Sequence, residues 1–205
     1  MEWPVDVALA RPVTHLPTGP WAYEVKVDGH RTVLWRTEDS VQLQSRTGRD
    51  VTALWMDLAV AGMRLPPGVI LDGEAVVYVA DGDRARISFS AAQSRGLSTP
   101  RRARELAGRH PATFVAFDIL AHPAVGLPDL RAHPYSERRQ VLVDVLAEVG
   151  PPIEPVWSTT DRSEAQIWFE ALEGTGVEGI VAKPLQSAYT PGKRVWCVDC
   201  TISAK

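Results

Sequence analysis

The order of apolar and polar residues along the chain predicts short strands mixed with separate helices. Residues 21–27 alternate apolar and polar side chains, as a half-buried strand does, and residues 31–35 and 41–45 read as its neighbours. Residues 53–63 carry apolar side chains at helical spacing, and the pattern stops before a pair of prolines. The first third of the chain therefore predicts strands followed by one helix.

The rest of the chain continues without a regular strand–helix alternation. Apolar runs at 69–71 and 75–79 are interrupted by Asp72-Gly73-Glu74, and an arginine-rich helical region is expected over 88–109. The further expected elements are a strand at 113–120, a helix at 134–149, a strand at 153–157, a helix at 163–172, a strand at 179–183 and a last strand near 194–198. This order favours an α+β fold with mostly antiparallel sheets flanked by helices around a cleft, as one domain over residues 1–205.

Composition narrows the class of protein. Hydrophobic residues make up 45% and charged residues 23% of the chain, as in an ordinary soluble globular protein. A stretch of about 18 apolar residues, which a membrane span requires, does not occur. The N-terminus lacks a basic segment followed by an apolar one, so we expect no signal peptide and a cytoplasmic location.

The net charge of −3 argues against a protein that coats nucleic acid through bulk electrostatics. Seven arginines nevertheless fall within one short middle region: Arg84, Arg86, Arg95, Arg101, Arg102, Arg104 and Arg109. They predict either a solvated surface with arginine–acid pairs or a patch that contacts a polynucleotide backbone.

The two cysteines, Cys197 and Cys200, form one Cys-x-x-Cys near the C-terminus. A zinc site needs about four ligands, and the sequence offers no second pair of cysteines or histidines at suitable spacing. We interpret both as incidental thiols.

The strongest candidate for chemistry is the segment that begins at Glu24. Glu24, Lys26 and Asp28 are spaced two residues apart, so on a strand their side chains share one face. A solvated face of an antiparallel strand would explain the same pattern. Gly29 allows close backbone approach and Arg31 supplies a fork for phosphate, and together they favour a ligand site.

A lysine amine in such a site is a candidate nucleophile. Its pKa must be lowered by desolvation or by nearby cations, and Arg31, Arg46 and Lys183 are candidates for that effect. Displacement at an α-phosphorus also needs a divalent ion held by carboxylates. The acids embedded among apolar residues are Asp72, Glu74, Asp118 and Glu178, and for each of them the alternative is a buried partner of an arginine.

Five segments in order resemble the signatures of one family. They are Glu24-Val25-Lys26-Val27-Asp28-Gly29 with Arg31, Ser45-Arg46-Thr47-Gly48, Leu71-Asp72-Gly73-Glu74, Phe117-Asp118-Ile119-Leu120 and Val177-Glu178-Gly179-Ile180-Val181-Ala182-Lys183. Together they resemble the ATP-dependent DNA ligases of the covalent nucleotidyltransferase superfamily. The resemblance implies a chain that forms a lysyl-AMP intermediate for sealing nicked duplex DNA.

The resemblance also implies roles for single residues. Lys26 would carry the AMP, Glu24 would lie near the adenine amino group, and Phe117 would stack on the purine. Arg31 and Arg46 would contact ribose or phosphate.

The remaining implied roles concern the phosphates and the metal. Glu74 would hold ribose hydroxyls or a metal-bound water, Glu178 would bind Mg²⁺ or Mn²⁺, and Lys183 would reach the α-phosphate of ATP. Arg194, just before the last signature, would also contact the nucleotide. Gly29, Gly73 and Gly179 would let the backbone approach closely.

The last signature departs from the family pattern. Val198 and Cys200 stand where the family has a pair of basic residues, and Asp199 adds a negative charge between them. Losing one pre-organised cation costs about a hundredfold or more in rate. The OB-fold domain of the family has no counterpart within 1–205. We therefore expect ATP binding, poor independent nick sealing, and an OB-fold or repair partner supplied in trans.

Two alternatives remain open. The first is an RNA ligase or a capping guanylyltransferase, which share Lys-x-Asp-Gly and the covalent intermediate; Glu24 and the run that ends at Lys183 favour the ATP-dependent ligase branch. The second is a non-catalytic nucleotide-binding or interaction module derived from a ligase, which Val198 and Cys200 support.

Overall fold

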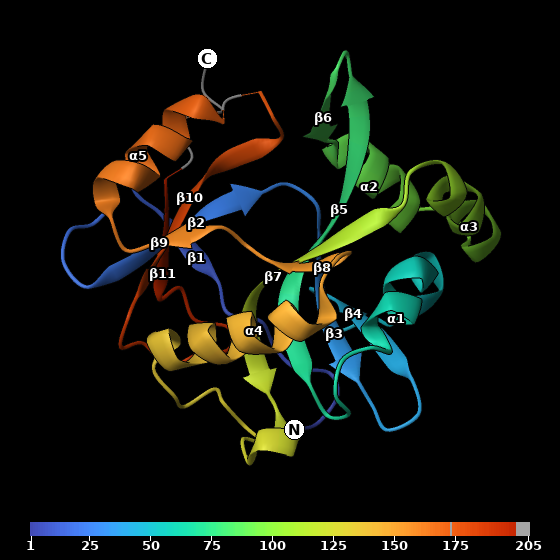
Figure 1. Cartoon of the computed structure of the whole chain (residues 1–205), viewed down its shortest axis with the longest axis horizontal. Helices are drawn as coiled ribbons and strands as arrows, with labels where there is room; N and C mark the ends of the chain where they lie inside the picture. Colours follow the sequence, from blue (N-terminus) through green and yellow to red (C-terminus); the bar gives the residue numbers. More distant parts are fainter. Residues whose placement is uncertain (173, 200–205) are drawn as a thin grey trace.

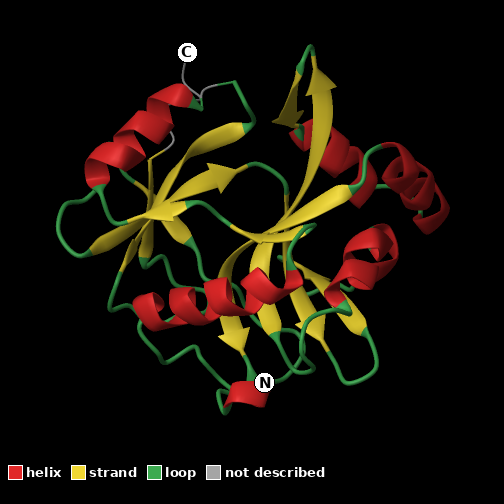
Figure 2. Cartoon of the chain, in the orientation of Figure 1, coloured by secondary structure: helices red, strands yellow, loops and turns green. Residues whose placement is uncertain are grey.

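The computed structural model describes residues 1–172 and 174–199. Two β-sheets with helices around them form the fold (Figures 1 and 2). The strands are β1 Ala10–Pro12, β2 Trp21–Val27, β3 His30–Arg36, β4 Val41–Ser45, β5 Ile70–Asp81, β6 Arg84–Ile87, β7 Ala112–Ala121, β8 Ile153–Pro155, β9 Ser158–Thr159, β10 Val177–Pro184 and β11 Trp196–Asp199. The α-helices are α1 Met56–Gly62, α2 Phe89–Gly96, α3 Pro100–Arg109, α4 Tyr135–Val149 and α5 Arg162–Ala171, and short 3₁₀ turns cover Thr52–Leu54 and Pro123–Val125.

The two sheets have the strand orders β1-β11-β10-β2-β9 and β4-β3-β5-β7-β8, and β6 pairs with the far end of β5. Within the described ranges, β1 with β11 and β7 with β8 run parallel, and the other neighbours are antiparallel. Figure 1 shows α5 against the first sheet and α4 across the second. The prediction of an α+β fold with mostly antiparallel sheets is confirmed.

The side chains of β2 divide between a core face and a cleft face. Tyr23 and Val25 are buried in the apolar cluster that α5 covers, whereas Glu24 and Lys26 point to the opposite side. The bounds of β2 match the predicted strand over 21–27, and those of β4 match the prediction over 41–45. The alternating pattern was therefore sufficient to place the strand that carries the candidate lysine.

The predicted interruption at Asp72-Gly73-Glu74 is wrong, because β5 runs through it as one continuous strand. The register against β7 shifts between Asp72 and Gly73, which marks a bulge. A Cβ atom on Gly73 would lie 2.6 Å from the carbonyl oxygen of Val115 on β7. The glycine thus lets two strands approach closely, and its polar neighbours are turned toward the cleft.

The predicted helical regions are subdivided in the structure. Residues 88–109 form α2 and α3, each capped at its start by a hydroxyl: Ser88 accepts from the backbone N–H of Ala91, and Thr99 accepts from that of Arg102. Residues 53–63 begin as a 3₁₀ turn and become helical only at Met56.

The arginine-rich region favours the solvated-surface interpretation with arginine–acid pairs. Arg95 is buried and forms a two-pronged ion pair with Asp57. Arg86 pairs with Asp81 at 3.6 Å, and Arg102 pairs with Glu105 at 3.0 Å. Several of these charges are therefore neutralised locally, which weakens the case for a patch of seven cations.

Two further expectations concern the cysteines and membrane segments. Cys197 is a free thiol buried in the core of the first sheet, and Cys200 lies outside the described residues. Among the helices of the described ranges, none has both the length and the apolar character needed to cross a bilayer.

Candidate active site

A cavity of about 100 Å³ lies between the two sheets and collects most of the predicted site residues. Its walls are Ala10, Glu24, Val25, Lys26, Val27, Arg31, Glu74, Phe117, Val181, Lys183 and Trp196. The walls come from β1, β2, β10 and β11 of one sheet and from β3, β5 and β7 of the other. Residues far apart in sequence thus form one polar cavity with aromatic walls.

Lys26 lies at the end of β2 and forms an ion pair with Glu178 of β10. The side chains are 32% and 35% exposed, so this pair is accessible from solvent. The position of Glu178 follows from the bulge in β10, where the register against β2 shifts between Val177 and Gly179. The structure therefore places a candidate metal ligand directly against the candidate nucleophile.

Lys183 and Glu24 form a buried ion pair in the wall of the cavity. The Lys183 Nζ atom lies 2.8 Å from Glu24 Oε2 and donates a hydrogen bond of 2.6 Å to the carbonyl oxygen of Phe117. The other Glu24 oxygen accepts a hydrogen bond from the Tyr135 hydroxyl. Burial lowers the pKa of Lys183, although Glu24 and Asp118 oppose this shift. Burial, followed by the charge of Glu24, raises the pKa of Tyr135, which keeps its phenol a donor.

Arg31 is fixed by an acid of the neighbouring strand. Its Nε and Nη2 atoms each lie 2.7 Å from an oxygen of Asp72, and its guanidinium sits 4.4 Å from the ring centre of Phe117. The Tyr189 hydroxyl donates to the same carboxylate at 2.6 Å. Asp72 is therefore the buried partner of an arginine, as one of the two interpretations predicted, and its oxygens are occupied.

Asp118 is used in the same way by a different arginine. Arg138 of α4 reaches its two oxygens at 2.7 and 3.0 Å, and both side chains are fully buried. Of the four acids embedded among apolar residues, Glu74 and Glu178 are the two that no arginine of the described residues holds in an ion pair.

Glu74 has a carboxyl oxygen without a hydrogen-bond partner among the described residues. This oxygen, Oε2, is buried. Burial raises the pKa of Glu74 to about 7 from its ordinary value of 4.5, and the nearby charge of Arg31 only partly offsets the rise. An orphaned acceptor in a cavity is a natural contact for a hydroxyl or a cation.

This raised pKa predicts a pH-dependent stability. The folded chain binds the proton of Glu74 more tightly than the unfolded chain, so the stabilisation is complete below about pH 4.5 and is lost as pH rises through about 7. Glu74→Gln cannot ionise. It should be more stable than the native chain at pH 8, by an amount on the order of 2 kcal/mol, and gain little at pH 4.5. Urea denaturation across this range measures the difference.

The control for this prediction is Glu38→Gln, since Glu38 is an exposed glutamate outside the cavity. It should leave the pH profile of unfolding unchanged. A Glu74→Gln profile parallel to that of the native chain would contradict the assignment.

Not every predicted site residue reaches the cavity. Arg46 is exposed and does not line it, and neither does Asp28. Arg194 lies outside the walls but donates a hydrogen bond of 2.8 Å to the carbonyl oxygen of Ala10, a wall residue. A Cβ atom on Gly29 would lie 2.6 Å from the carbonyl oxygen of Ala75, so this glycine, like Gly73, permits close contact between strands.

Two residues of the site were missed at the level of sequence. Trp196 forms a wall, and its ring contacts Phe117 edge-on with centres 6.1 Å apart. Its place in the last family signature could have identified Trp196 as a site residue. Tyr135, which fixes Glu24, begins a helix and has no sequence pattern that would mark it.

Comparison with known proteins shows the class to which this site belongs. A family model described as "ATP dependent DNA ligase domain" matches residues 6–197. The chain therefore belongs to that family, and the resemblance inferred from the five segments is confirmed.

Individual relatives agree with this assignment. The chain is 40% identical to DNA ligase C2 of Mycolicibacterium smegmatis over 98% of its own length and 56% of the relative's, and 40% identical to DNA ligase C of Mycobacterium tuberculosis over 98% and 57%. A mycobacterial DNA ligase D solved with ATP and MES superposes with a TM-score of 0.71 at 30% identity, covering 96% of this chain and 60% of that one. The chain thus spans little more than half the length of these relatives.

Proposed function

We propose that this chain is the nucleotidyl-transfer core of an ATP-dependent DNA ligase, which transfers AMP from ATP to Lys26 ahead of the sealing of nicked duplex DNA. The observation that carries the proposal is the cavity itself, where Lys26 meets Glu24, Arg31, Glu74, Phe117 and Lys183. The ligase relatives support the choice of ATP and DNA over GTP and RNA.

The reaction joins the lysine nitrogen to phosphorus. The Lys26 ammonium first gives a proton to solvent, and the resulting amine attacks the α-phosphorus of ATP. A P–N bond forms, the P–O bond to the β-phosphate breaks, pyrophosphate leaves, and the nitrogen gives a second proton to solvent. Lys26 sits at the open end of the cavity and is one-third exposed, so a phosphate has access to it. The neighbouring cations are Arg31 and Lys183, both held by acids.

The base and ribose have separate contacts in this proposal. The aromatic pair Phe117 and Trp196 offers apolar ring surface to the purine. Glu24 is fixed by Tyr135 and Lys183 as an acceptor at the same wall, in keeping with a role near the adenine amino group. The unpartnered oxygen of Glu74 is suited to a ribose hydroxyl.

Arg31 acts mainly as a fixed positive charge. Asp72 occupies its fork, so we assign it to electrostatic stabilisation of the phosphates and not to a bidentate grip on them. We keep Arg46 and Arg194 as contacts made outside the cavity, toward the parts of ATP that extend from it.

The acids present fit a divalent ion of the Mg²⁺ or Mn²⁺ type. The described residues contain no cluster of three or more metal-ligating side chains. Such an ion usually takes one or two protein carboxylates and completes its shell with phosphate oxygens and water, which Glu74 and Glu178 would allow. When bound, it supplies positive charge to the phosphates. Glu178 would then exchange its ion pair with Lys26 for contact with the metal.

Incubation with α-labelled ATP and a divalent ion, followed by a denaturing gel, tests the proposal. Covalent label is expected, and GTP should give far less. Saturable ATP binding without covalent label would instead support the non-catalytic module, the alternative that Val198 favours.

The replaced basic residue leads to a further prediction. Val198 lies on β11 two residues from Trp196, so both share the cavity face, and it pairs with Val181 of the cavity wall. Val198→Lys would add a cation on this face. The rate of labelling should rise roughly tenfold, a fraction of what one pre-organised donor contributes.

Val198→Met is the matched control, since it has similar length and no charge, and it should leave the rate unchanged. An equal rate for the lysine and methionine chains would show that Lys193, an arginine or another group already supplies the cation. The matching position Cys200 lies outside the described residues.

A further inference from the structure

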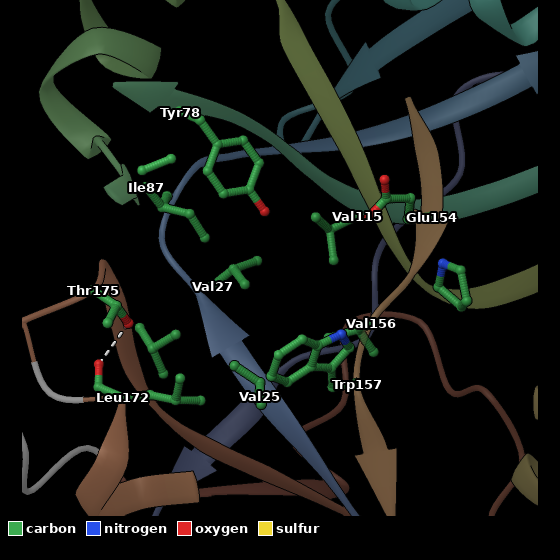
Figure 3. A pocket seen from close by; sticks show the side chains of 13 residues that line it. Val25, Val27, Tyr78, Ile87, Val115, Glu154, Val156, Trp157, Leu172 and Thr175 are labelled. Atoms are coloured by element: carbon green, nitrogen blue, oxygen red, sulfur yellow. Dashed lines mark hydrogen bonds between the residues drawn. The ribbon is translucent and has the colours of Figure 1, made fainter. Parts of the chain in front are cut away.

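A second, larger cavity of about 340 Å³ lies on the other side of β2 from the active site. Val25 and Val27, which flank Lys26, form its floor, and Val115 of β7 closes one side (Figure 3). Val177, the residue before Glu178, also lines it. The cavity therefore sits directly behind the Lys26–Glu178 ion pair.

The segment before β10, which forms part of the cavity wall, is held by backbone hydrogen bonds from β6 and from the end of β2. The Ile87 N–H of β6 donates to the carbonyl oxygen of Thr175 at 3.0 Å, and the Asp28 N–H donates to that of Gly176 at 3.2 Å. Gly176 has a φ of +89°, and a Cβ atom there would lie 2.3 Å from the Ile87 carbonyl oxygen. The hairpin of β5 and β6 is thus packed tightly against the segment before β10 at one wall of the cavity.

Aromatic side chains stand at the mouth of the cavity. Tyr78 and Trp157 are 40% and 64% exposed, which is high for residues of this size. Figure 3 shows the two rings on either side of the cavity with Val27 between them. The two rings, together with the apolar side chains below them, provide a surface on which a flat molecule can stack.

The charge of this second cavity comes from one acidic residue. Among the described lining residues, Glu154 is the one that carries a formal charge at neutral pH. Burial raises the pKa of the Tyr78 phenol, and the negative charge of Glu154 raises it further. A negative charge without a basic residue disfavours phosphates and nucleic acid, and it favours a positively charged amine.

We propose that this cavity is a second ligand site, for a small flat ring compound that carries a positively charged amine. The volume lies within the range of small-molecule pockets, the ring would occupy the apolar interior, and the amine would meet Glu154 at the mouth. The site is separate from the nucleotide cavity, and its existence does not depend on the proposed ligase chemistry.

The test uses two probes of one shape and opposite charge, 2-naphthylmethylamine and 2-naphthylacetate. Each is titrated into the full ¹⁵N-labelled chain while amide shifts are followed. The amine should bind saturably with a Kd below about 1 mM and move the amides of Val25, Val27 and Val115. The acid should bind at least about fivefold more weakly, and Glu154→Gln should remove that preference.

A second experiment fills the cavity with a larger side chain. Ala85 lines the cavity from β6, so Ala85→Phe should abolish amine binding. Arg86→Phe adds the same ring on the opposite face of that strand and should leave binding intact. Absence of saturable binding, equal binding of amine and acid, or amine binding that survives Ala85→Phe would each overturn the proposal.

Discussion

Lys26→Ala should fold normally and lose all covalent AMP label. The sequence contains four lysines, which are Lys26, Lys183, Lys193 and Lys205. Lys183 is buried and held by Glu24, and Lys193 does not line the cavity. Lys26 alone among the described lysines presents its amine at the open part of the cavity, so its removal leaves none of these lysines placed to attack an α-phosphorus.

The measurement is a denaturing gel with α-labelled ATP, followed by mass mapping of the labelled peptide. Lys193→Ala is the matched control and should label at the native rate. Loss of a partly exposed ion pair changes stability by at most about 1 kcal/mol, so the thermal midpoint of Lys26→Ala should stay close to native. Label on Lys183 in this variant would disprove the assignment.

Arg138→Met should destabilise the fold by about 3 to 5 kcal/mol. Arg138 is fully buried, holds both oxygens of Asp118, and donates to the carbonyl oxygens of His133 and Ser187 at 2.6 and 2.8 Å. Its loss leaves a buried carboxylate with the backbone N–H of Ile119 at 3.0 Å and the amine of Lys183 at 3.8 Å, and that amine lies closer to Glu24. The contacts also tie α4 to β7, the strand that carries the cavity-wall residue Phe117.

Urea denaturation measures this loss, and the next residue supplies the control. Arg139 is partly buried and donates to the carbonyl oxygen of Val156 at 2.7 Å, so Arg139→Met should cost about 1 kcal/mol. Adding Asp118→Leu to Arg138→Met should recover part of the loss, because the orphaned charge is then gone. Equal losses for the two arginines would contradict the buried-pair argument.

The sequence was a good guide wherever one face of a strand is apolar. The alternation over 21–27 located β2 and put Glu24 and Lys26 on one face, which the cavity confirms. It failed at Asp72-Gly73-Glu74, which the pattern predicted as an interruption between two apolar runs. These residues are polar because β5 crosses the cleft there, with Asp72 bound to Arg31 of the next strand.

The hydrogen-bond and ion-pair partners of the site residues could not be predicted from local sequence patterns. Each acid near the lysine could be a metal ligand or the partner of an arginine, and only tertiary pairing separates the two. Asp72 and Asp118 are partners, whereas no arginine of the described residues holds Glu74 or Glu178 in an ion pair. The bond from Tyr135 to Glu24 joins residues 111 positions apart and leaves no periodic trace in the sequence.

The two-faced character of β2 has a consequence for redesign of the chain. A slip of one residue in its pairing with β10 would turn the amine of Lys26 toward the apolar side of the strand and Val25 and Val27 toward the cleft, so the valines specify the register. Alternate residues of β2 thus serve different purposes: the valines specify how the strand packs, and the polar residues between them line the proposed active site. The proposed nucleophile, Lys26, should be exchangeable for another nucleophilic residue, such as a cysteine, while the backbone keeps the same path.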